Sequence, residues 1–310
     1  LVTSLVESTV QKKLAETAQT AGEAAENVRR LVHEELAAGL EAADAEVIQE
    51  ALKGLPRRRA SLTDLNERLK ALGKGVSLDP VKTLRLTRTA QDLEDQKWSI
   101  TRGVHGLGRS RFGIAIISDR IARWAGRFPN HPYLSPQVVE VSPEGGDLVL
   151  GLAVAAVKRH VERIREMHRA ELYLENPPDL PGRLAELEDL SWKDLSEEEK
   201  LSCPPLLVLT DETALRSQGI EALDRLLGSD YPVKVVLVDS RDIREDTADP
   251  SLLAVSRQTA YVVRTSLAAP RHLAEGIRGA VTYAGSALIL SLIHISEPTR
   301  PLYISYAVFC

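Results

Sequence analysis

Acidic residues follow two apolar runs in the carboxyl-terminal part of the chain. Asp211 and Glu212 come directly after the run 206–210, and Asp239 closes the run 232–239. Both runs are typical of strands that are buried on two sides in a parallel sheet. Because ligands of such sheets bind outside the carboxyl ends of the strands, we expect Asp211 and Asp239 to lie at the ligand-binding edge. Carboxylate oxygens suit Mg²⁺ and Ca²⁺, so a bare divalent cation is one candidate ligand.

The second run leads into a further acidic segment, which reads RDIRED (241–246). It brings Glu245 and Asp246 close in sequence to the strand end at Asp239. Three interpretations stay open for this group of carboxylates: a metal and diphosphate site, the remains of such a site, or a solvated acidic loop.

Strand and helix patterns alternate from Pro204 onward. This alternation predicts an α/β fold with an open parallel sheet and right-handed crossovers. The expected strands are 206–210, 232–239, 260–267 and 286–290, and the expected helices are 212–227, 250–258 and 270–282.

The segment 101–203 is expected to belong to the same α/β domain. Near its start, glycines precede a strand expected at 114–117, whereas a dinucleotide-binding loop follows its strand. A long helix is expected at 147–174. Its histidines, His160 and His168, are too far apart to share a metal without another ligand, and we expect both at the surface. Residues 176–203 are rich in proline and glutamate and are interpreted as an acidic connector.

Helical patterns dominate residues 1–100, which form the α-helical N-terminal region. Apolar residues recur at helical spacing across 5–53, which predicts one long helix or two joined near Gly39. Shorter helices are expected at 63–72 and 79–98. Amphipathic helices of this kind pack against each other or against a partner. The expected organisation is therefore a helical region at 1–100 followed by an α/β domain at 101–289.

Composition excludes several classes of protein. The formal net charge is −5, whereas a general nucleic-acid surface needs a basic patch, so no nucleic-acid partner is expected. No apolar run has membrane-spanning length and no signal peptide opens the sequence, so we expect a cytoplasmic protein without a membrane partner. Two cysteines, Cys203 and Cys310, cannot supply the four thiolates of an iron–sulfur cluster.

The two ends of the sequence are unusual. The chain begins at Leu1 and has one methionine, far downstream, so we expect a longer polypeptide to precede it. The segments LSLIHISEPTR (290–300) and ISYAVFC (304–310) resemble translated sequencing-library adapters. We therefore expect residues 290–310 to be an artefactual tail. The alternative is a genuine strand at 289–295.

The α/β pattern also resembles a known family. The segments GIEALDRLLGSDYPVKVVLVDSRD (219–242) and SLLAVSRQTAYVVRTSLAAPRHLAEGIRGAVTYAGSALI (251–289) look like the thiamine-diphosphate domain of the pyruvate (2-oxoacid):ferredoxin/flavodoxin oxidoreductases. A glycine-containing helix precedes a strand that ends in aspartate, and helices and strands then follow in the same order. The resemblance covers 204–289 well and 101–203 faintly, and it does not extend to 1–100.

This resemblance implies a sheet of thiamine-diphosphate-enzyme type and a specific chemistry. In the family, Mg²⁺ joins the two phosphates of the cofactor to an aspartate, an asparagine and a backbone carbonyl. The cofactor adds to a 2-oxoacid, which loses carbon dioxide. Iron–sulfur clusters in other domains pass electrons to ferredoxin or flavodoxin, and coenzyme A accepts the acyl group. The implied partners are the other domains or subunits of the oxidoreductase, in a homo-oligomer.

Carried over to this sequence, the aspartate ligand falls on Asp211 and the asparagine ligand falls near Glu245. The glycines beside the aspartate are replaced by Thr210 and Glu212, whose side chains obstruct the close approach that glycine allows. Clustered carboxylates also repel a diphosphate at short range. The resemblance implies Asp211 and Glu245 as metal ligands, and as cofactor-binding residues Asp211, Glu212, Asp239, Glu245 and Asp246.

Two functions follow from these observations. The first is a fragment of a 2-oxoacid:ferredoxin oxidoreductase, which contributes a divergent thiamine-diphosphate domain to oxidative decarboxylation. No catalytic residue is assigned to this chain, and the fragment alone is expected to be inactive. The second is a non-catalytic, degenerate scaffold or subunit-docking domain of such a complex.

Overall fold

The computed structural model describes most of the chain, in two compact units. The described residues are 2–41, 80–103, 112–125, 133, 135–218, 220–239, 250–292 and 305–306. One unit, the sheet unit, comprises Leu1–Thr17, Ser99–Glu162 and Ser191–Cys310. The other, the helical unit, comprises Ala18–Trp98 and Arg163–Leu190.

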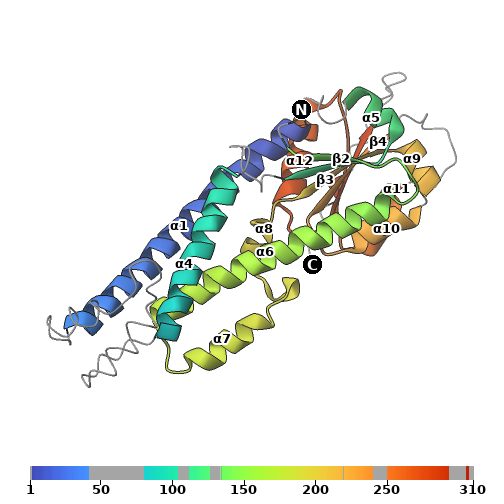
Figure 1. Cartoon of the computed structure of the whole chain (residues 1–310). Coiled ribbons are helices and arrows are strands. Elements are labelled where there is room, and N and C mark those ends of the chain that lie inside the picture. Colours follow the sequence, from blue (N-terminus) through green and yellow to red (C-terminus); the bar gives the residue numbers. More distant parts are fainter. Residues whose placement is uncertain are drawn as a thin grey trace. The chain divides into compact units, whose positions relative to one another are not determined.

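The sheet unit is built on one sheet (Figure 1). Its strand order is β2-β1-β3-β4-β6-β5-β7. All pairings among β1 to β6 are parallel, and β7 runs antiparallel to β5 at one edge. The expected α/β fold with an open parallel sheet is therefore confirmed. The strands are β1 (Gly113–Ile116), β2 (Gln137–Val139), β3 (Leu206–Asp211), β4 (Val233–Asp239), β5 (Tyr261–Ser266), β6 (Ala287–Leu292) and β7 (Ser305–Tyr306).

The central strands form the core because they are apolar on both faces. Burial is continuous from Leu207 to Glu212 along β3 and into the next helix, and from Val233 to Leu237 in β4. The core combines these strand residues with the inner faces of helices, and it includes Ala115, Val149, Val208, Leu223, Leu226, Val235, Leu237, Val262 and Leu288.

Helices connect successive strands as the alternation predicts. α12 (Pro270–Thr282) matches the helix expected at 270–282, because proline is favourable at the first helical position. The helix expected at 212–227 is instead two helices, α9 (Glu212–Gln218) and α10 (Ile220–Gly228), and Gly219 between them lies outside the described residues. The sheet unit also contains α5 (Asp119–Ala125), α11 (Pro250–Arg257) and the first part of α6 (Gly145–Glu175).

His160 of α6 is buried, so its expected place at the surface is wrong. Its Nε2–H donates to the backbone oxygen of Glu199 at 2.8 Å. Its ring lies edge-on to the indole of Trp192, with 6.2 Å between the centroids. The histidine therefore holds the last part of the expected connector, which forms a 3-10 turn (Trp192–Asp194) and α8 (Glu197–Leu201).

The helical unit contains parts of α1 (Val2–Glu41), α4 (Pro80–Thr101) and α6, together with α7 (Leu180–Glu188). Its core is formed by Ala21, Ala25, Val28, Leu86, Ala90, Leu93, Ala170 and Tyr173. The helix expected at 5–53 is present as α1 up to Glu41. Its remainder and the helix expected at 63–72 lie outside the described residues. Among the helices of the described residues, none is both long and apolar enough to cross a membrane.

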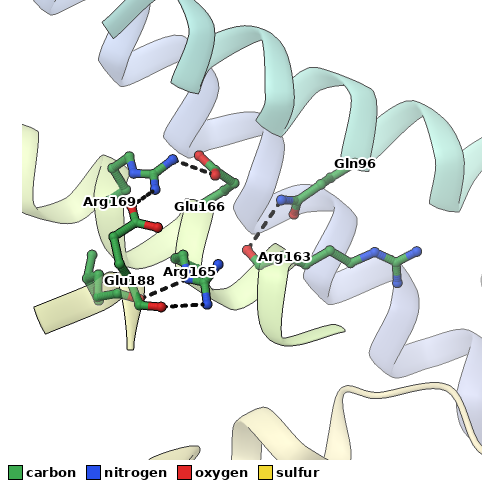
Figure 2. Close-up of polar contacts among 7 residues, drawn as sticks. Gln96, Arg163, Arg165, Glu166, Arg169 and Glu188 are labelled. Carbon is green, nitrogen blue, oxygen red and sulfur yellow. Dashed lines mark hydrogen bonds and ion pairs between the residues drawn. The ribbon is translucent and has the colours of Figure 1, made fainter. Parts of the chain in front are cut away.

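Arginines of α6 hold the end of α7 in the helical unit (Figure 2). Arg165 donates from Nε to the backbone oxygen of Leu187 at 2.8 Å and from Nη2 to that of Glu188 at 3.1 Å. Arg169 bridges the carboxylates of Glu166 and Glu188 at 2.6 and 2.7 Å. A cation at the carboxyl end of a helix satisfies carbonyls that have no partner within the helix, so this cluster fixes the α6–α7 hairpin.

The strand expected at 286–290 is longer in the structure. β6 runs from Ala287 to Leu292 and pairs with β4 and β5 along its length. Leu290, the first residue of the tail described above, is fully buried. The artefactual origin of residues 290–310 stays a prediction.

Candidate functional site

The carboxyl ends of β3 and β4 lie beside each other in the middle of the sheet. Asp211 is the last residue of β3 and pairs with Val238, so Asp239, the last residue of β4, is one position further along. The two aspartates are thus at one edge of neighbouring parallel strands, where sheets of this type bind ligands. Their role as ligand-binding residues stays a prediction.

Asp211 caps the helix that follows it. Its side chain is 1% exposed, and its Oδ1 accepts a hydrogen bond from the backbone N–H of Ala214 at 2.8 Å. This is the bond of an N-cap residue to the third residue of a helix, here α9. The other oxygen, Oδ2, is buried and has no hydrogen-bond partner among the described residues. The fold therefore uses Oδ1 as the helix cap, and Oδ2 is not bonded within the described part of the chain.

Glu212 forms an ion pair at the same edge. Its side chain is 11% exposed, and its Oε1 lies 3.3 Å from Nη1 of Arg120. Arg120 comes from α5, whose start is capped by Ser118 through a bond from the N–H of Ile121 at 3.1 Å. The cation that α5 brings to this edge is therefore already matched by a carboxylate.

The remaining expected site residues, Glu245 and Asp246, lie outside the described residues, so the expected metal pair of Asp211 and Glu245 is not tested. In the parts of the chain that the structure describes, no three histidine, cysteine, aspartate or glutamate side chains are placed to hold a metal ion.

Mg²⁺ and thiamine diphosphate, which the resemblance implies, do not fit the described residues of this edge. A diphosphate needs backbone N–H groups or cations, and glycine lets the backbone approach it closely. Instead, the buried side chains of Thr210, Asp211 and Glu212 occupy the end of β3. The carboxylate of Glu212 also takes the guanidinium of Arg120 that an anion would need.

Sequence reasoning missed Arg120 and the buried Lys234 of β4. Arg120 has a local signal, because Ser118 directly after an apolar run is a typical N-cap and the charged residues behind it begin a helix. Lys234 interrupts an otherwise apolar run, VKVVLV (233–238), which marks it as a residue that needs partners inside the fold.

None of the protein-family models compared with the chain matches it, and no curated protein matches it. Among solved structures, the chain is similar to 2-oxoglutarate:ferredoxin oxidoreductase from Magnetococcus marinus with 2-oxoglutarate, coenzyme A and succinyl-CoA bound. The identity is 15% and the TM-score is 0.37, over 62% of this chain and 57% of that chain. This chain thus spans little more than half the length of that protein.

Proposed function

We propose that the sheet unit is a non-catalytic domain of thiamine-diphosphate-enzyme type, which serves as a scaffold for other domains or subunits of a 2-oxoacid:ferredoxin oxidoreductase-like protein. The order of strands and helices across 204–289 supports the type of domain. We infer the loss of cofactor binding from the ion pair between Glu212 and Arg120 at the carboxyl end of β3.

The physical reason is electrostatic. A diphosphate at this edge would meet the carboxylates of Asp211 and Glu212 at short range, and Arg120 would have to leave Glu212 to bind it. Removing the cation from a mostly buried carboxylate such as that of Glu212 leaves an uncompensated charge, which is costly. The sheet itself does not depend on the cofactor, because its core is apolar.

A second candidate function is the catalytic one, in which the domain binds Mg²⁺ and thiamine diphosphate for the oxidative decarboxylation of a 2-oxoacid. The observation in its favour is the buried Oδ2 of Asp211, which has no hydrogen-bond partner in the part of the chain that the structure describes. An oxygen of this kind is a suitable ligand for a hard cation.

Isothermal titration calorimetry separates the two functions. The full chain, with the companion domains of its protein supplied, is titrated with thiamine diphosphate in the presence of Mg²⁺, and with Mg²⁺ alone as the control. The proposal expects no saturable heat at millimolar cofactor. Saturable binding that is lost in Asp211→Ala would reject the scaffold function and support the catalytic one.

A further inference from the structure

A small cavity lies in the sheet unit at the amino ends of β3 and β4, opposite the edge that carries Asp211. It has room for about one water molecule, about 10 Å³. The residues preceding the two strands, Pro205 and Pro232, form part of its wall, as do Tyr283 and Ala284 after α12. Three lysines also line it, and each comes from a different element: Lys13, Lys200 and Lys234.

Lys234 is the most buried of these lysines, with 1% of its surface exposed. Its ammonium group donates to the backbone oxygen of Tyr283 at 2.8 Å and to that of Gly285. A lysine ammonium has three N–H donors, so these carbonyls satisfy two of them. Within the described residues, no oxygen or nitrogen acceptor is found for the third, and the ammonium lies over the ring of Tyr283, 5.8 Å from its centroid. A buried donor without an acceptor is costly, so the cavity is where an acceptor is needed.

The charges around the cavity are mostly of one sign. Burial lowers the pKa of Lys234 to about 7; Cys203 acts in the opposite direction, and Lys13 lowers it further. Burial lowers the pKa of Lys13, and the nearby carboxylate of Glu16 raises it. Lys200 has carboxylates in ion-pair range, Glu197 at 3.7 Å and Asp230 at 4.0 Å, and both are well exposed. Among the described residues, the wall of the cavity therefore contains three lysines and no carboxylate.

We propose that this lysine-lined cavity binds one small monovalent inorganic anion such as chloride. The anion accepts the third N–H of Lys234 and offsets the combined charge of the three lysines. Size favours a small ligand, because the space holds about one water molecule. Binding is coupled to protonation of Lys234, since an adjacent anion favours the charged form of an amine.

Thermal unfolding of the full chain tests the proposal. Sodium chloride is titrated against sodium gluconate at constant ionic strength, because gluconate is too large for the cavity. The expected result is a saturable rise in Tm on the order of 2 °C with chloride. The rise should be absent in Lys234→Met. It should persist in Lys158→Met, which removes an exposed lysine of α6 in the same unit.

Two further measurements keep the test decisive. If Lys234→Met does not fold, Lys13→Gln removes a second lysine of the cavity, and a weaker response to chloride is expected. Crystals grown in sodium bromide should show an anomalous peak in the cavity. An equal Tm in chloride and gluconate, or a response that both lysine variants retain, would overturn the proposal. If the cavity holds only a water molecule, Tm will be equal in chloride and gluconate.

Discussion

Nη1 of Arg120 lies 3.3 Å from Oε1 of Glu212, and this pair joins α5 to the carboxyl end of β3. The two partners differ in their contact with water. The arginine side chain is 53% exposed, whereas the glutamate side chain is 11% exposed. Most of the electrostatic benefit therefore belongs to Glu212, which has lost hydration and depends on the guanidinium for compensation.

Arg120→Ala should lower the free energy of unfolding by about 1–2 kcal/mol, because it leaves a mostly buried carboxylate without its cation. Urea denaturation of the full chain measures this loss. The matched control is Arg123→Ala on the same helix. Arg123 forms an ion pair with Asp119, and both side chains are exposed. The free energy of unfolding should therefore change by no more than about 0.5 kcal/mol. Equal losses in the two variants would contradict the assigned role of Glu212.

Asp211 allows a prediction that separates capping from metal binding. Asp211→Asn keeps an oxygen that can accept from the N–H of Ala214, whereas Asp211→Ala removes it. We expect Asp211→Ala to cost about 1–2 kcal/mol and Asp211→Asn to cost less than half of that, because asparagine is an equally good N-cap. Thermal unfolding without metal measures both. If asparagine is as destabilising as alanine, the negative charge, rather than the cap, is what the fold requires.

The sheet could be predicted from sequence because the patterns of its strands and helices are local and periodic. Buried parallel strands appear as short apolar runs, and the amphipathic helices between them fix the alternation. The bounds of α12 were predicted well because Pro270 marks its start. The division into α9 and α10 was not predicted, since one glycine inside a helical pattern does not by itself end a helix.

The charged interior groups could not be predicted in the same way, because their partners are distant in sequence. Lys234 bonds to residues 49 and 51 positions away, and Arg120 bonds to one 92 positions away. No local pattern shows which distant carbonyl or carboxylate will compensate a buried charge. His160 is an intermediate case. Its spacing from the buried Ala153 and Val157 on α6 was available, but the carbonyl of Glu199 was not.

The lowered pKa of Lys234 also predicts how the free energy of unfolding depends on pH. Burial lowers its pKa from 10.5 to about 7 in the folded chain, while the unfolded chain keeps the ordinary value. Between pH 7 and about 10.5 the unfolded state binds the extra proton, so the free energy of unfolding should rise with pH in this window. Below pH 7 both states are protonated and the contribution is constant. The slope from this group is at most about 1.4 kcal/mol per pH unit.

Urea denaturation from pH 6 to 10 measures this dependence in the wild-type chain and in Lys234→Met. Because other groups of the chain also titrate, the informative quantity is the difference between the two proteins. That difference should rise above pH 7 and be flat below it. A difference that is flat throughout would mean that Lys234 keeps its proton in the folded state, held by the carbonyls of Tyr283 and Gly285.

The packing of α12 against β5 depends on the absence of a side chain at Gly276. A Cβ atom at this position would come within 2.7 Å of Cγ2 of Val263, a buried residue of β5. Gly276→Ala should therefore destabilise the chain by about 1–3 kcal/mol through overpacking, although alanine favours the helix itself.

Gly151→Ala on α6 is the matched control. It has nothing within 4 Å and should be neutral or stabilising by up to about 1 kcal/mol. Adding Val263→Ala to Gly276→Ala should recover part of the loss, since the two sites are in contact and their effects are not additive. If Gly276→Ala were as well tolerated as Gly151→Ala, α12 would have to lie further from β5 than the structure places it.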